Sequence, residues 1–502
     1  MQSVMKHQFS QVPKANIPRS VFNRSHGYKT TFDSGYLVPF YVDEALPGDT
    51  FNLRATMFAR MSTPIFPLMD NMFMDVFYFA VPLRLLWTNF QKFMGEQTDP
   101  EDSTDFTVPQ IVAPAVTGWA TGTLSDYFGL PTGIPGVSAS AFWHRAYNLI
   151  YNQWFRDQNM QDSVVVDTDN GPDTNSDYVL LKRGKRHDYF TSCLPWPQKG
   201  PGVELPLGEQ AIVKTSDTAL LSGVQNTLRW KSAAAGIEPG GATLGTRAGG
   251  GTAVFGDPPT GSNNVYPSNL YADLSDATAA TINSLREAFQ LQRLYERDSR
   301  SGSRYTEILR SHFGVISPDA RLQRPEYLGG TTAPVRFMPV AQTSESNTTP
   351  QGTLSAFATI TVQGAGFTKS FVEHCVILGL LCVRADLTYQ QGLPRMFSRS
   401  TRWDFYWPSL AHLGEQAVLN KEIYCQGPAV LNSDNEPVDN DVFGYQERFA
   451  EYRYYPSKIT GKLRSTAAGS LDAWHLSQEF DDLPTLSPEF IEENVPMIMV
   501  LS

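Results

Sequence analysis

A chain of 502 residues with 41% hydrophobic and 12% aromatic residues can bury a large core, which excludes disordered, fibrous and disulfide-stapled proteins. Only 18% of the residues are charged, below the roughly 25% of ordinary soluble domains, so much of the surface is expected to contact other protein. The net charge of -11 excludes attraction of the whole chain to nucleic acid or anionic lipid and restricts such contacts to local basic segments.

The first segment, residues 1–32, is basic. It contains no Asp or Glu and five cations: Lys6, Lys14, Arg19, Arg24 and Lys29. Two interpretations remain open here. The segment is either a basic arm that contacts a polyanion, or a frayed solvated terminus of the kind that many chains have.

Strand patterns follow the arm. Residues Tyr36 to Val42 are rich in aromatic and β-branched side chains, and Phe51 to Arg60 alternate apolar with polar residues. Met72 to Val81 form a nearly continuous apolar run that Pro82 ends, as in a strand buried on both faces. The N-terminal part of the chain is therefore expected to be β-structure.

Helical patterns fill the middle of the chain. Residues Ser140 to Asp157 repeat large apolar side chains at helical spacing, and so do residues 277–298, whose expected buried side is Ile282, Leu285, Ala288, Phe289, Leu291, Leu294 and Tyr295. A shorter helix is expected over Tyr305 to Phe313, ended by Gly314 as a C-cap. These patterns predict helical insertions at residues 84–157 and 275–314.

Between the helical patterns, residues 200–265 have a composition that cannot supply its own core. The part from Gly240 to Ser262 contains eight glycines, among them Gly240, Gly241, Gly249, Gly250 and Gly251. We expect a long surface excursion, mobile or ordered by contact with neighbouring copies.

Further strands are expected near the other end, over Leu354 to Val362, Phe371 to Val383 and Val442 to Tyr455. Strands at both ends around a dissimilar middle predict a mainly β fold, with one β-domain over residues 33–502 that is closed by distant segments and interrupted by long insertions.

Motifs that would support catalysis are missing from the sequence. It has no GxxxxGK[ST], HExxH, GxSxG or strand-linked GxGxxG motif, and the four cysteines have neither CxxC spacing nor a histidine at zinc-finger distance. The acidic loop from Asp99 to Asp105 lacks the Gly and terminal Glu of a calcium loop and is expected to be solvated. No run approaches the ~18 apolar residues of a membrane span. We expect no enzymatic activity, cofactor, metal or membrane insertion.

Arginines are concentrated in residues 286–310, where aromatic residues and four acids lie among them. They are Arg286, Arg293, Arg297, Arg300, Arg304 and Arg310. They are candidates for holding the phosphates of single-stranded DNA while the aromatic rings stack on its bases. Ion pairing at i,i+3 and i,i+4 spacing, or across a subunit interface, explains the same pattern equally well.

Three segments together resemble one family: QVPKANIPRSVFNRSHGYKTTFDSGYLVPFYVDEALPGDTF near the N-terminus, MDVFYFAVPLRLLW after it, and LREAFQLQRLYERDSRSGSRYTEILRSHFGV from Leu285 to Val315. The chain is similar to the major capsid proteins of gokushoviruses, which are single-stranded DNA phages of the microvirus family. The resemblance covers essentially the whole chain and is weakest in the Gly-rich excursion.

This resemblance implies a viral-capsid jelly roll of eight antiparallel strands with large loop and helical insertions. It implies a homo-oligomeric T=1 icosahedral capsid around a circular single-stranded DNA genome, with the 200–265 excursion as a protrusion at the three-fold axes. The implied partners are a small basic DNA-binding phage protein, an internal scaffolding protein, a pilot protein and a host surface receptor. The protein would be located in the virion, after assembly in the host bacterial cytoplasm.

Two other classes of function compete with the capsid role. A carbohydrate-binding jelly roll would use Trp403, Tyr406 and Trp407 as aromatic faces for sugars, although packing in the core or in an interface explains these residues better. A replication initiator would need an HxH metal pair, which the sequence lacks.

Overall fold

The computed structural model describes residues 18–64, 66–203, 282–494 and 497–501, and between residues 203 and 282 it describes only the backbone of six short strands. The chain divides into two compact units. One unit consists of residues 1–197 and 301–502, and the other of residues 198–300. The 200–265 excursion falls within the second unit.

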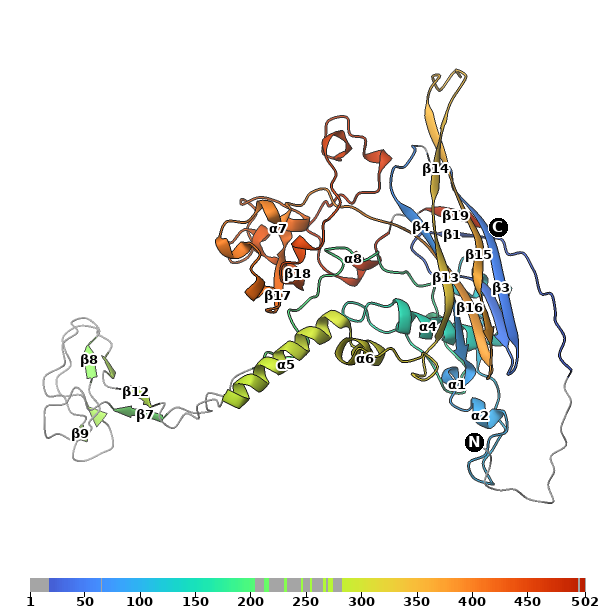
Figure 1. Cartoon of the computed structure of the whole chain (residues 1–502), viewed down its shortest axis with the longest axis horizontal. Helices are drawn as coiled ribbons and strands as arrows, with labels where there is room; N and C mark the ends of the chain where they lie inside the picture. Colours follow the sequence, from blue (N-terminus) through green and yellow to red (C-terminus); the bar gives the residue numbers. More distant parts are fainter. Residues whose placement is uncertain are drawn as a thin grey trace. The chain divides into compact units, whose positions relative to one another are not determined.

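A five-stranded antiparallel sheet forms one side of the first unit (Figure 1). Its strands, in spatial order, are β1 (Thr30–Asp33), β19 (Ile498–Leu501), β3 (Thr50–Met61), β15 (Leu354–Ser370) and β14 (Arg336–Ala341). Segments from the two ends of the chain therefore lie side by side in this sheet, and β19 occupies the position between β1 and β3.

A four-stranded antiparallel sheet packs against it. Its spatial order is β13 (Glu326–Pro334), β4 (Met72–Pro82), β16 (Cys375–Ala385) and β2 (Val38–Ala45). The main hydrophobic core joins the two sheets, with Met57 and Ile360 from the five-stranded sheet and Val76, Ile377 and Leu381 from the four-stranded sheet. The prediction of a mainly β, antiparallel fold is confirmed.

The other face of the four-stranded sheet is also covered. All eleven residues of β16 are buried, and Val376, Leu378 and Leu380 belong to a second core beneath the insertion that follows β4. The insertion contains α1 (Leu83–Leu86), α2 (Phe90–Phe93), β5 (Gln110–Val112), α3 (Leu124–Tyr127), β6 (Ser138–Ser140) and α4 (Phe142–Ile150), which continues as a π-helix over Tyr151–Phe155. The continuous apolar run in β16 is thus explained by burial on both faces.

A third core stabilises the chain after β16. It contains Tyr389, Val418, Ile423, Phe443 and Phe490. The elements around it are β17 (Glu415–Leu419), α7 (Asn420–Ile423), β18 (Val442–Glu447) and α8 (Pro488–Glu492). Short 3-10 helices occur at Asn175–Asp177, Arg395–Phe397, Arg402–Asp404, Pro408–Leu410, Val438–Asn440, Ala450–Tyr452, Gly461–Leu463 and Asp472–Trp474.

In the second unit, the described strands pair as three nested antiparallel ribbons. Strand β7 (Ile212–Thr215) pairs with β12 (Leu270–Asp273), β8 (Trp230–Ser232) with β11 (Val265–Pro267), and β9 (Gly245–Thr246) with β10 (Ala253–Val254). The long helix α5 (Ile282–Ser301) follows, and α6 (Tyr305–Phe313) lies in the first unit.

Two sequence-based predictions are wrong in detail. The strand expected over Val442 to Tyr455 ends at Glu447, because Phe449 adopts a left-handed backbone with φ of 62° and a 3-10 turn follows. The apolar side of α5 is not buried: Ile282 is 71% and Phe289 64% exposed, and Ser299 is the buried residue of this helix. Periodicity identified the helix correctly, but a partner for its apolar side is missing among the described residues of this single chain.

Candidate functional site

Cations of the basic arm are partly engaged with the first unit. Arg24 forms an ion pair with Asp43 of β2 at 2.9 Å, and Arg19 donates to the backbone carbonyl of Gly48. Lys29 is exposed, whereas Lys6 and Lys14 lie outside the described residues. The contact of the arm with DNA therefore stays a prediction.

The arginine-rich segment is divided between the two units. Arg286, Arg293, Arg297 and Arg300 lie on α5 and are all exposed, and Arg310 is exposed on α6. Arg304 pairs with Glu307 at 2.9 Å and donates to the backbone carbonyls of Asn152 and Arg156. Because its guanidinium is used within the fold, the ion-pair interpretation fits Arg304, and the other five remain candidates for DNA contact.

The Gly-rich stretch that is expected to form the protrusion belongs to the second unit. Its candidate residues, Gly240, Gly241, Gly249, Gly250 and Gly251, lie outside the described residues.

An exposed group of aromatic residues, here called the aromatic surface, lies on the segment after β16. Trp403, Tyr406 and Trp407 are 53%, 50% and 43% exposed, so packing in the core does not explain them. The Trp403 and Trp407 rings are 6.4 Å apart, and the Arg402 guanidinium lies 4.1 Å from the centre of the Trp403 ring. The other members are Phe397, Phe405, Tyr452, Tyr454 and Tyr455.

A pocket of about 320 Å³ opens beside the aromatic surface. Its lining combines Phe397, Tyr454 and Tyr455 with the ion pair between Arg395 and Glu422, whose atoms are 3.0 Å apart. Burial raises the pKa of the Glu422 carboxyl, and the adjacent guanidinium opposes this shift. The pocket therefore leads from the aromatic surface inward to two charged side chains that form an ion pair with each other.

A buried ion pair joins α4 of the insertion to the loop at residues 167–173 that follows it. Arg145 of α4 and Asp173 are both fully buried, and Arg145 Nε donates to Asp173 Oδ2 at 2.7 Å. The guanidinium also donates to the backbone carbonyls of Leu86 and Asp169 at 2.9 Å. Sequence reasoning missed this pair, although the acidic run DTDNGPD over residues 167–173 was an available signal.

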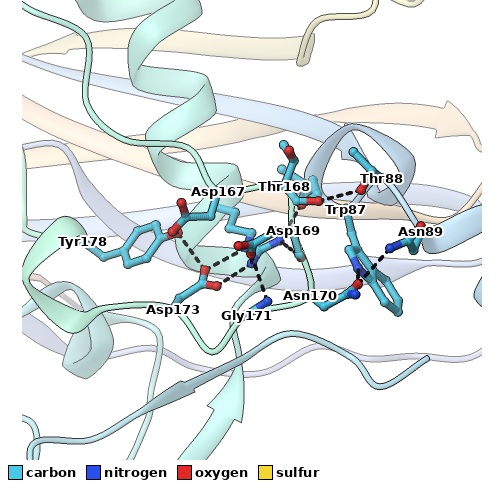
Figure 2. A network of polar contacts seen from close by, with 12 residues as sticks. Trp87, Thr88, Asn89, Asp167, Thr168, Asp169, Asn170, Gly171, Asp173 and Tyr178 are labelled. Carbon is cyan, nitrogen blue, oxygen red and sulfur yellow. Dashed lines mark hydrogen bonds and ion pairs between the residues drawn. The ribbon is translucent and has the colours of Figure 1, made fainter.

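The loop that carries Asp173 is held on both sides (Figure 2). Tyr178 donates its hydroxyl to Asp173 at 2.7 Å, and the Trp87 indole donates to Asn170 at 2.8 Å. Burial and the hydrogen bond to the Asp173 carboxylate raise the pKa of Tyr178. The geometry suits a rigid structural joint, because every group in it is occupied by another group of the chain.

His144 lies next to this joint in a dry environment. Its Nε2 lies 2.9 Å from the Ser125 hydroxyl, and its ring packs edge-on against Phe128 and Tyr178. Burial lowers the pKa of His144 from 6.5 to about 4, and the nearby Asp173 carboxylate opposes this shift. The imidazole is therefore neutral in the folded protein at neutral pH.

Replacement of His144 by glutamine should reduce the acid sensitivity of the fold. The folded-state pKa is below the unfolded value, so the contribution of the neutral ring is full above pH 6.5 and is lost as the pH falls toward 4. Between pH 7.5 and 5 the native protein should lose about 2 kcal/mol more stability than His144→Gln. Urea unfolding at both pH values measures the difference, and equal losses would contradict the prediction.

The described residues contain no group of three or more His, Cys, Asp or Glu side chains that could hold a metal ion. In the same part of the chain, no helix has the length and apolar character needed to span a membrane.

Comparisons with known proteins agree with one another. The family model described as "Capsid protein (F protein)" matches residues 10–502. "Capsid protein VP1" of Bdellovibrio phage phiMH2K is 49% identical over 497 residues, which cover 98% of this chain and 91% of that protein. Proteins of the same name from Chlamydia phage 1 and Spiroplasma virus 4 are 44% and 39% identical, and the matches cover 100% and 97% of this chain and 93% and 90% of those proteins.

Proposed function

Because the chain belongs to the family of phage capsid proteins (F proteins), and is thus a structural protein of the virion and not an enzyme, we propose that it forms a T=1 icosahedral shell around a circular single-stranded DNA genome. Its resemblance to the capsid proteins of gokushoviruses is confirmed. The capsid role requires that copies of the chain associate with one another. The shell geometry and the genome are the proposed part.

The proposed fold of the subunit is an eight-stranded jelly roll. In chain order, β1, β3, β15 and β19 belong to one sheet, and β2, β4, β13 and β16 belong to the other. This interleaving of strands from both ends of the chain supports a pair of Greek keys wrapped into two four-stranded sheets. In this assignment β14 is an additional strand at the edge of the first sheet.

The aromatic surface is the observation that supports assembly most directly. Exposed Trp and Tyr residues with stacked arginines are typical of the central, energetically dominant parts of protein interfaces. A chain with few charges that leaves Trp403, Tyr406 and Trp407 exposed needs another surface to cover them. Another copy in the shell provides such a surface.

Electron microscopy and native mass spectrometry test the shell. The protein should be expressed with and without its phage partners, and uniform icosahedral particles are expected. Persistent monomers with all partners present would contradict the proposal. In that case the alternative function would be carbohydrate binding through the exposed Trp403 and Trp407 rings. A glycan array with purified monomer would detect it.

Genome contact must overcome the charge of -11 on each copy. We assign it to two sources: the basic arm, facing inward, and the small basic DNA-binding phage protein lining the interior. The exposed arginines of α5 and α6 are further candidates. The scaffolding protein, the pilot protein, the host receptor, the three-fold protrusion and assembly in the host cytoplasm belong to the same proposal.

Neutralising the basic arm should lower the amount of packaged DNA. The variant replaces Lys6, Lys14, Arg19, Arg24 and Lys29 by glutamine, which removes five candidate phosphate-binding charges and should reduce the salt dependence of DNA binding by about 3.5 in the log-log slope. Nuclease-resistant DNA per purified particle is the readout. Since Arg24 also pairs with Asp43, particle yield must be measured in parallel. Unchanged packaging in normally formed particles would eliminate the role of the arm.

A further inference from the structure

One face of the five-stranded sheet is not covered by the residues that the structure describes. Inward-facing residues of β3 such as Met57, Ala59 and Met61 are buried in the main core, whereas the residues between them are exposed. In Figure 1 the helices of the first unit lie on the side of the four-stranded sheet, and none covers the far side of β3 and β15. We call this exposed side the outer sheet face.

The outer sheet face is basic. It contains three exposed arginines, Arg54 and Arg60 on β3 and Arg336 on β14. Strands β3, β14 and β15 contain no Asp or Glu at all. At the margin of the face, Asp33 of β1 accepts hydrogen bonds from the backbone N–H groups of Ser34 and Met497.

The three arginines also differ from most others in the first unit because they form no side-chain hydrogen bond or ion pair with any described residue. Elsewhere in that unit, many arginines are paired with carboxylates: Arg84 with Glu373, Arg145 with Asp173, Arg183 and Arg384 with Asp75, Arg395 with Glu422, and Arg399 with Glu451. A protein with net charge -11 thus leaves positive charge uncompensated on this face.

The strand register fixes how the arginines are spaced. Arg60 lies opposite Thr359 of β15, and Thr359 lies opposite Arg336 of β14, so the two arginines are in one row, two strands apart. Neighbouring strands are about 4.8 Å apart, which places these two positions about 10 Å from each other. Arg54 is on the same face of β3, about 20 Å from Arg60 at the usual rise per residue.

The residues between the arginines suit a nucleic acid strand. Thr56, Thr361 and Gln363 are exposed there and offer uncharged hydrogen-bonding groups, and Asn52 adds another just beyond Arg54. Phe58, which is 50% exposed, lies between Arg60 and Thr56 on β3 and provides an aromatic surface on which a base can stack. Single-stranded nucleic acid sites combine these three elements: cations that follow the backbone, neutral hydrogen-bonding groups, and aromatic rings that stack on bases.

We propose that the outer sheet face, which is on the outside of the single subunit, lines the interior of the assembled shell. There it binds the sugar-phosphate backbone of the packaged single-stranded DNA through Arg54, Arg60 and Arg336. This assignment rests on the proposed function and adds to it a DNA site distinct from the basic arm. It also fixes the orientation of the subunit, because the sheet that faces the genome must point toward the centre of the particle.

A triple charge variant tests the DNA contact. The variant Arg54→Gln, Arg60→Gln and Arg336→Gln is compared with a control that removes the same charge from exposed positions outside the two sheets: Arg321→Gln, Lys462→Gln and Arg464→Gln. A fluorescent single-stranded oligonucleotide is titrated with each full-length chain at several salt concentrations. The log-log salt slope should fall by about 2 for the sheet variant and stay at the native value for the control. An equal slope for both variants would overturn the proposal, even if the sheet variant formed no particles.

A labelling experiment tests the orientation. Thr56→Cys is made in a Cys425→Ser background, because Cys425 is the exposed cysteine among the described residues. In intact particles, a maleimide coupled to a carrier too large to enter the shell should not react with position 56 until the particles are opened. Labelling of intact particles would place the sheet outside and overturn the assignment.

Failure of this inference can be distinguished from failure of the proposed function. If native protein forms particles with single-stranded DNA but the sheet variant packages as much DNA as its control, only the inference fails. If the sheet variant binds DNA normally but loses assembly, the face contacts another protein copy. If native protein forms no particles or packages no single-stranded DNA, the proposed function itself fails.

Discussion

Replacing Arg145 by methionine should destabilise the subunit by about 3–5 kcal/mol, the range observed when one partner of a buried ion pair is removed. Arg145 and Asp173 are fully buried, so the variant leaves a carboxylate without its cation in a dry environment. It also leaves the carbonyls of Leu86 and Asp169 without their donor. Urea unfolding of the unassembled full-length chain measures the change.

An exposed ion pair provides the matched control. Arg186 and Asp386 are 2.9 Å apart, but their side chains are 45% and 39% exposed, so Arg186→Met should cost no more than about 1 kcal/mol. Adding Asp173→Asn to Arg145→Met should recover part of the loss, because the unpaired buried charge is then removed. Equal costs at Arg145 and Arg186 would show that the buried joint does not stabilise the insertion.

Replacing Gly366 by alanine should have an effect of similar size, about 3 kcal/mol, and should strongly reduce particle yield. A Cβ atom at this position of β15 would lie 1.9 Å from the backbone carbonyl oxygen of Leu53 on β3. Neither backbone can move away without breaking the ladder that joins the two longest strands of the sheet. Urea unfolding and particle counts by electron microscopy measure the result.

A second variant, Gly364→Ala two residues earlier in β15, distinguishes steric clash from backbone strain as the cause of the lost stability. The φ of Gly364 is +71°, but no atom lies within 4 Å of the position where a Cβ would be. Gly364→Ala should therefore cost only the strain of a left-handed backbone, about 1–2 kcal/mol. A cost at Gly364 equal to that at Gly366 would exclude the close approach of the strands as the cause.

The long strands could be predicted from sequence because their burial pattern is visible within one segment. The alternation in β3 and the apolar runs of β4 and β16 are such patterns. Strands β1 and β19 have four residues each, too few for a period to be recognised, and they exist because they pair with each other and β19 pairs with β3. Strand β13 contains two adjacent glycines, which resemble a turn signal.

The functional surfaces were less predictable, because their role depends on parts of the fold outside the segment that carries the pattern. Arg54 and Arg60 look like the polar half of an ordinary alternating strand, and their meaning depends on which face of the sheet stays uncovered. The apolar side of α5 was recognised from its spacing, but the described residues of the single chain do not bury it. Sequence patterns show which residues need a partner, whereas the identity of the partner depends on the fold and on the assembly.

The position of β19 between β1 and β3 has a consequence for synthesis. The ribosome adds β19 almost the whole length of the chain after β3, and until then the facing edges of β1 and β3 have no partner. Open strand edges invite pairing with other chains. Closure of this sheet is therefore a late step, and a prematurely terminated chain that lacks residues 498–501 cannot complete it. As a result, only a subunit that has been translated as far as β19 can form the complete five-stranded sheet.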